Sequence, residues 1–118
     1  MGYSSFVETM APDRRRERER GRHVRCPAER TLAVIGGRWK VPLVWLLLGG
    51  DKRPSELRRH LGAVTAKVLT QQLRELERDG VLRRTVYPEV PPKVVYALTA
   101  RGKSLRPVVE AMCRWGKC

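Results

Sequence analysis

The pattern of apolar and polar residues near the middle of the chain predicts two neighbouring helices. The first is short, at Ser55–Arg59. In the second, Ala66–Asp79, leucines recur every three or four residues, as in a helix that buries one face. Gly62–Thr65 would form the turn between them, with Thr65 as the N-cap of the second helix and Gly80 at its end. The pattern is that of a helix-turn-helix.

Beyond Gly80 the residue types change to those of strands. Val81–Tyr87 and Lys93–Thr99 are rich in β-branched and aromatic residues, and prolines stiffen the connection Pro88–Pro92. A helix-turn-helix followed by a hairpin is a winged helix-turn-helix, which places its second helix in the major groove of DNA and the hairpin beside it. The expected fold class is therefore α+β, mainly α, and the expected partner is double-stranded DNA.

Apolar segments on the N-terminal side predict two more helices. The first would begin after Cys26, because proline suits the first helical position and Cys26 would be the N-cap. Gly36-Gly37 would end it. The second tolerates Pro42 only in its first turn. Its residues Leu43–Leu48 are apolar on every side, so we expect this helix to be buried in the centre of the domain.

The C-terminal segment carries an apolar stripe with the spacing of one helix face: Leu105, Val108, Val109 and Met112. We expect Thr99 to cap this helix and Pro107 to kink it. A terminal helix has little core left to cover in so small a domain, so its stripe is a candidate dimer interface. Packing against its own subunit is the alternative.

Charge divides the chain into two expected regions. Residues 1–25, with the charge-dense run Arg14–Arg20, predict a basic, disordered arm, and residues 26–118 a single folded domain. The arm is either a solvated tail or a source of further phosphate contacts. The whole chain of 118 residues has 25 lysines and arginines against 12 acidic residues, a net charge of +13. This balance favours an anionic partner, nucleic acid first and an acidic membrane surface second.

Several classes of protein are disfavoured by what the sequence lacks. The longest apolar run, Val41–Leu48, is too short to cross a bilayer and has no signal-peptide cleavage pattern, so we expect a cytoplasmic protein without a membrane partner. No nucleophile–base pattern, P-loop or dinucleotide fingerprint occurs, so we expect neither enzymatic activity nor a cofactor. A metal site is conceivable but lacks paired ligand spacing; its donors would be His23, Cys26, His60, Cys113 and Cys118.

The polar face of Ala66–Asp79 carries side chains suited to the edges of bases. Arginine and lysine pair with guanine, glutamine with adenine, and threonine with a methyl group or a phosphate. The residues expected in the major groove are Thr65, Lys67, Thr70, Gln71 and Arg74. The acidic residues Glu75, Glu77 and Asp79 lie later in the helix, away from DNA. A solvated amphipathic helix is the alternative, which the neighbouring turn and hairpin disfavour.

The hairpin adds cations that would position the protein on DNA. Backbone phosphates or a narrow minor groove are the expected targets. The residues in question are Arg83, Arg84 and Lys93. A solvated strand residue is the alternative for each.

Taken together, these residues resemble the HxlR-type transcriptional regulators, a branch of the MarR-like winged-helix proteins. The motifs that carry the resemblance are Cys26-Pro27, Ile35–Lys40, Ser55–Arg58, Lys67–Glu77, Asp79–Arg84, Tyr87–Pro91 and Val95–Thr99. The resemblance implies a homodimeric repressor or activator in a bacterial cytoplasm. Its dimer interface would be built from the flanking N- and C-terminal helices, and each subunit would read half of a pseudo-palindromic operator.

The cysteines add a candidate switch. Cys26 matches the cysteine that some members of that family use to sense oxidants or electrophiles. A thiol at a helix N-terminus, preceded by Arg22, His23 and Arg25, should have a stabilised thiolate. Cys113 or Cys118 would then resolve oxidised Cys26 across a dimer. The alternative is a capping or buried Cys26 without a regulatory role.

Two other functions remain open at this point. The charge would also suit an RNA- or ribosome-associated basic protein without sequence preference, although the sequence predicts a wing and few stacking aromatics. A protein-interaction module on the same fold would use the helix face for a partner and bind DNA weakly.

Overall fold

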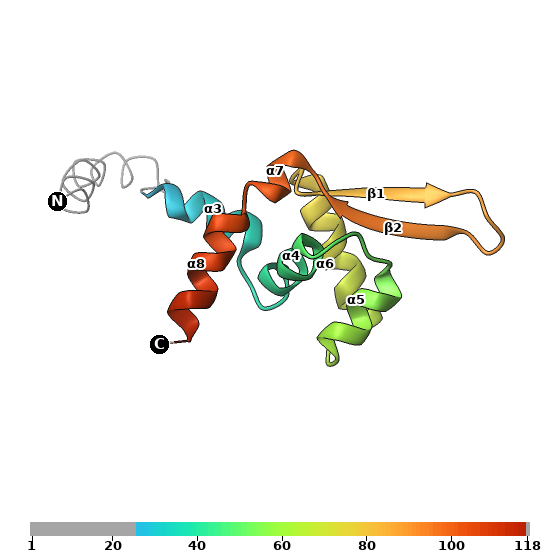
Figure 1. The fold of residues 1–118 in the computed structure, drawn as a ribbon, viewed down its shortest axis with the longest axis horizontal. Coiled ribbons are helices and arrows are strands. Elements are labelled where there is room, and N and C mark those ends of the chain that lie inside the picture. The colour runs from blue at the N-terminus through green and yellow to red at the C-terminus, as the bar shows by residue number, and fades with distance from the viewer. Residues whose placement is uncertain (1–25, 118) are drawn as a thin grey trace, which may run out of the picture. The chain divides into compact units, whose positions relative to one another are not determined.

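The computed structural model describes residues 26–117, which fall into six helices and one two-stranded antiparallel sheet (Figure 1). The elements are α3 (Pro27–Ile35), α4 (Lys40–Leu48), α5 (Pro54–Leu61), α6 (Ala66–Arg78), β1 (Leu82–Tyr87), β2 (Lys93–Leu98), α7 (Ala100–Lys103) and α8 (Arg106–Gly116). The chain divides into two compact units at residue 34, so α3 is described by itself. The predicted mainly helical winged helix-turn-helix is confirmed.

The turn between α5 and α6 has the geometry that the sequence predicts. Gly62 ends α5 with a φ of 74°, and its N–H donates to the Arg58 carbonyl at 2.9 Å. Only glycine adopts such a φ freely. The Thr65 hydroxyl accepts from the Val68 N–H at 3.1 Å, which confirms Thr65 as the N-cap of α6. The first contact marks the end of α5 and the second the beginning of α6.

The hairpin is held in one register from Leu82 opposite Leu98 to Tyr87 opposite Lys93. Lys52, in the segment between α4 and α5, adds a short bridge to Tyr96 through two backbone hydrogen bonds of 3.0 and 2.8 Å. Figure 1 shows both strands extending away from the helices toward the tip. The base of the wing is therefore tied to the helices while its tip is exposed.

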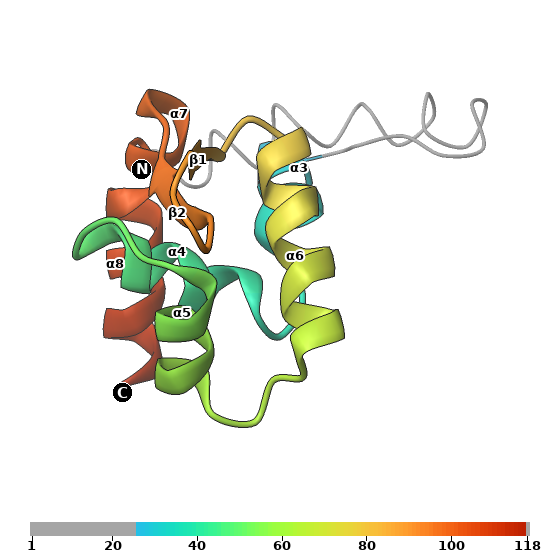
Figure 2. The same cartoon turned by 90° about the vertical axis from the view of Figure 1, so that its right-hand side faces the viewer.

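The core lies among α4, α5, α6, α8 and the base of the hairpin. Its fully buried side chains are Ile35, Leu43, Val44, Leu57, Leu73, Leu76, Val81 and Val109. Leu69, Leu73 and Leu76 are all buried, as the helical period of α6 predicts. In Figures 1 and 2, α6 and α8 lie on opposite sides of α4.

The expectation that α4 is buried on all sides is wrong. Leu43, Val44 and Leu47 are buried, but the Trp45 residue is 48% exposed. Trp45 instead lines a surface hollow together with His60 of α5 and Arg106 of α8.

The single kinked C-terminal helix predicted from the sequence is also wrong. Thr99 caps only the short helix α7, accepting from the Gly102 N–H at 3.0 Å. α8 then begins afresh with Pro107 in its first turn, where the missing N–H costs no helical hydrogen bond. Gly102 packs directly against the Val81 carbonyl, which a Cβ at this position would overlap.

Among the helices of residues 26–117, none alone is long and apolar enough to cross a membrane; only α3 and α4 taken together meet that test.

Candidate nucleic-acid interface

The exposed face of α6 forms a shallow hollow of about 800 Å³. Its lining residues are Ala66, Lys67, Thr70, Gln71, Arg74, Glu75 and Arg78. Four of the residues expected in the major groove are thus brought together, and Thr65 is exposed at the start of the same helix. Arg78 was missed, although it follows Arg74 by one helical turn and the period could have identified it.

Two threonines at this face already use part of their hydrogen-bonding capacity. The Thr65 hydroxyl oxygen accepts the capping bond, and the Thr70 hydroxyl donates to the Ala66 carbonyl at 2.9 Å. Thr70 is left with its methyl group and an acceptor oxygen. It is therefore better suited to a thymine methyl group than to donating a bond to phosphate.

A second hollow of about 440 Å³ lies where α5, α6 and the hairpin meet. It is lined by Pro54, Thr70, Arg74, Glu77, Arg84, Val94 and Tyr96. Thr70 and Arg74 line both hollows, so the α6 face continues onto the wing. Two guanidinium groups, one from the helix and one from the wing, line the same concave surface.

The three wing cations predicted from the sequence do not lie on one face of the hairpin. Paired residues in an antiparallel sheet share a face, and successive residues alternate. Arg84 pairs with Tyr96 on the face toward α6, whereas Arg83 pairs with Ala97 on the opposite face. Lys93 shares that opposite face with Tyr87, its ammonium lying 5.3 Å from the ring centroid. Arg84 alone of the three therefore lines the hollow beside α6.

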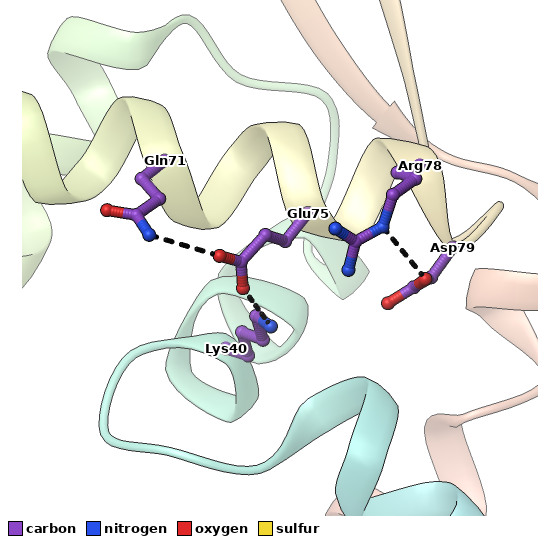
Figure 3. A network of polar contacts seen from close by, with 5 residues as sticks. All are labelled: Lys40, Gln71, Glu75, Arg78 and Asp79. Atoms are coloured by element: carbon purple, nitrogen blue, oxygen red, sulfur yellow. Dashed lines mark hydrogen bonds and ion pairs between the residues drawn. The ribbon is translucent and has the colours of Figure 1, made fainter.

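Glu75 connects this surface to the interior (Figure 3). Its carboxylate accepts from the Lys40 ammonium at 2.5 Å and from the Gln71 amide nitrogen at 3.3 Å. The contact with Lys40, followed by that with Gln71, lowers the pKa of Glu75 below its ordinary value of 4.5. Glu75 was expected to lie away from the binding face, but it lines the same hollow as Gln71 and Arg74. Lys40 was missed, because no sequence signal pairs residues 35 positions apart.

The described cysteines are unpaired and half-buried. Cys26 directly precedes α3, and its carbonyl accepts from the Glu29 N–H at 2.8 Å. Cys113 lies on α8, and Cys118 and the arm of residues 1–25 fall outside the described residues. Within residues 26–117, no three histidine, cysteine or acidic side chains gather as a metal site would require.

Helix α8 carries exposed apolar side chains on its outer face. Val109 is buried, but Met112 is 43% exposed and Trp115 is 82% exposed. Val108, one helical turn before Met112, is also exposed. This face contrasts with the cationic face of α6 in the same unit.

Comparison with known proteins identifies a family that matches this chain. Residues 34–118 match the family described as HxlR-like helix-turn-helix. The HTH-type transcriptional regulator YdeP of Bacillus subtilis (strain 168) is 52% identical over 92 residues, which cover 78% of this chain and 72% of that protein.

Solved structures give the same result. The redox regulator HypR in its oxidized form is similar with a TM-score of 0.75 and 51% identity, covering 78% of this chain and 95% of that one. The reduced form of the transcriptional regulator YodB from B. subtilis has a TM-score of 0.69 and 34% identity, covering 78% and 91%. YdeP and YodB are transcriptional regulators and HypR is a redox regulator, and regulators of this kind are not enzymes.

Proposed function

The chain belongs to the HxlR-like helix-turn-helix family of transcriptional regulators, and from this we propose that it is a sequence-specific regulator acting as a cytoplasmic homodimer on a pseudo-palindromic operator. The family implies DNA binding. The observation that carries the finer proposal is the continuous surface in which Arg74 of α6 and Arg84 of β1 line one hollow. A helix that enters the major groove would bring both guanidinium groups to the same duplex.

The roles proposed for this surface follow from the chemistry of its side chains. Lys67, Gln71 and Arg74 contact base edges, and Thr70 contacts a thymine methyl group. Thr65 and Arg84 contact phosphates, and Arg83 and Lys93 act at longer range because they lie on the other face of the wing.

The apolar face of α8 supports the proposed homodimer. Met112 and Trp115 offer exposed apolar surface that a second copy would bury, and a dimer would place two copies of α6 on successive half-sites. Together with α3, α8 would build the interface.

We further propose that the regulator responds to oxidants through Cys26. HypR, at 51% identity, is a redox regulator, and Cys26 directly precedes helix α3 as an unpaired, half-buried thiol. Oxidation would form a disulfide with Cys113 or Cys118 of the other subunit, the oxidant taking up the two electrons and the two thiol protons leaving.

Binding-site selection from genomic DNA with purified protein, repeated with reductant and with diamide, tests this function. We expect a recurrent inverted repeat with half-sites about one helical turn apart. Diffuse enrichment without a motif would instead favour the RNA- or ribosome-associated alternative, in which charge alone binds nucleic acid.

A Cys26→Ser variant separates the redox proposal from the DNA-binding proposal. It should select the same motif as the native chain and retain it under diamide, whereas the native chain should lose or gain binding. An unchanged oxidant response in Cys26→Ser would contradict the role of Cys26 and leave the DNA-binding proposal intact.

A further inference from the structure

We propose that Lys40 and Glu75 are positioning residues that fix the Gln71 amide on the exposed face of α6 and so determine which base it reads. The inference rests on the proposed function, because it concerns the selectivity of the same surface. It assigns a role to a buried lysine that packing does not explain.

Lys40 is a buried cation in an unfavourable place. The residue is 7% exposed and opens α4, where the helix dipole disfavours positive charge. A buried ammonium persists only with a charged partner and hydrogen bonds. Its Nζ atom lies 2.5 Å from Oε1 of Glu75, whose side chain is 27% exposed. A leucine or methionine would fill the same space without these costs, so burial alone does not account for the ion pair.

Glu75 links the buried Lys40 to Gln71 on the exposed face of α6. Lys40 occupies Oε1, and Oε2 accepts from Nε2 of Gln71 at 3.3 Å. An ionised carboxylate only accepts hydrogen bonds, so Gln71 must turn its NH₂ group toward Glu75; the flipped amide would set two oxygens against each other. In Figure 3, the Gln71 nitrogen points toward Glu75 and its oxygen points away along the helix.

A fixed amide presents a defined pattern to DNA. One N–H of Nε2 is used by Glu75, which leaves one donor and the acceptor Oε1. Adenine is read by glutamine through one donor and one acceptor, at N7 and N6. A free amide can exchange its two ends and pay rotamer entropy on binding, whereas the amide held by Glu75 does neither. The held Gln71 should therefore discriminate more sharply than a free one.

Lys40 also offsets the negative charge that Glu75 brings to the α6 hollow. The Glu75 carboxylate lines the same hollow as Arg74 and Arg78 and would repel a phosphate backbone if unpaired. The adjacent Lys40 ammonium offsets this charge from inside the domain without projecting into the hollow.

The test is binding-site selection with five proteins: the native chain, Gln71→Ala, Glu75→Gln, Lys40→Met and Glu110→Gln. Gln71→Ala identifies the base position that Gln71 reads. Glu75→Gln keeps the size of the side chain and an acceptor for Lys40, but its own amide no longer forces one orientation on Gln71. Glu110→Gln makes the same change of charge on α8, on the side of that helix away from Met112 and Trp115.

We expect Glu75→Gln and Lys40→Met to lose about tenfold in preference at the position identified by Gln71→Ala, and to keep their preferences elsewhere. Glu110→Gln should match the native chain. Thermal melting shows whether each variant is folded, and Glu75→Gln decides the question alone if Lys40→Met is not. A native preference in Glu75→Gln at that position would overturn the inference while Gln71→Ala still supports the proposed function. If the native chain selects no motif, the proposed function fails and this inference with it.

Discussion

Helices α6 and α8 bury one face each in the same core but differ in what their outer faces present. Leu73 of α6 and Val109 of α8 are both buried, and the two helices lie on opposite sides of α4 (Figure 2). The outer face of α6 is cationic and hydrogen-bonding, whereas that of α8 exposes Met112 and Trp115. The buried faces stabilise the domain, and the outer faces are the ones proposed to bind DNA and a second copy of the chain.

Introducing charge on the α8 face should have the largest effect on DNA binding. Met112→Glu would place a carboxylate in the proposed dimer interface, where burial without a partner is costly. We expect a monomer in analytical ultracentrifugation and a loss of operator affinity of about 100-fold or more, because two linked half-sites gain that much by acting together.

The matched control is Ala100→Glu, which adds the same charge at an exposed position of α7. It should remain dimeric. A dimeric Met112→Glu variant would show that α8 does not form the interface.

Truncating the buried face of α6 should have the largest effect on stability. Leu73 is 2% exposed, so Leu73→Ala removes core contacts and leaves a cavity. We expect a loss of about 2–5 kcal/mol in the free energy of unfolding, measured by urea denaturation. Val108→Ala on the exposed face of α8 should cost far less in a monomeric background, and equal losses would mean that α8 is packed more fully than its exposure indicates.

Removing single cations should distinguish the proposed base contact of Arg74 on α6 from the proposed phosphate contact of Arg84 on the wing. Arg74→Ala should cost about 1–3 kcal/mol on the selected operator and relax preference at one base pair. Arg84→Ala should weaken binding to all sequences and reduce the salt dependence by about one unit of slope.

Arg83→Ala is the control for Arg84→Ala, since it removes the same charge from the opposite face of the hairpin. It should change affinity less than Arg84→Ala. Equal effects would contradict the assignment of the two wing faces.

The smallest effect is expected from Glu56→Gln, which changes the stability of the first turn of α5, the helix that precedes α6. The Arg53 N–H donates to the Glu56 carboxylate at 2.8 Å, and this bond lowers the pKa of Glu56 below 4.5. The stabilisation is therefore present above the unfolded-state pKa and is lost as pH falls through the lower folded-state value. Melting temperatures of Glu56→Gln should fall less steeply on acidification than those of the native chain, with Glu110→Gln as the charge control; parallel profiles would refute the role of this bond.

Local patterns were enough to predict the helix-turn-helix and which side chains of α6 are exposed together. The leucine period placed α6, and Thr65 and Gly62 marked the turn, because capping and positive φ depend on single residue types. Arg78 followed from the same period but was overlooked.

Features that depend on tertiary contacts were not predictable in the same way. The Lys40–Glu75 pair joins helices distant in sequence, and which wing face turns to α6 depends on how Leu82 and Leu98 pack. The exposure of Trp45 and the break between α7 and α8 depend on how these helices pack in the folded domain, which a local sequence pattern does not contain. The homodimer and the cysteine switch depend on a second chain and stay predictions.

The central claim is that the α6 face recognises a DNA sequence rather than negative charge in general. Its most direct test is competition at fixed salt among the selected operator, a scrambled duplex and an RNA duplex of equal length. We predict binding to the operator at least about 1,000-fold tighter than to either competitor, and a margin reduced by about 1–3 kcal/mol in Arg74→Ala. Similar affinity for all three would contradict the claim and identify the chain as a charge-driven nucleic-acid binder.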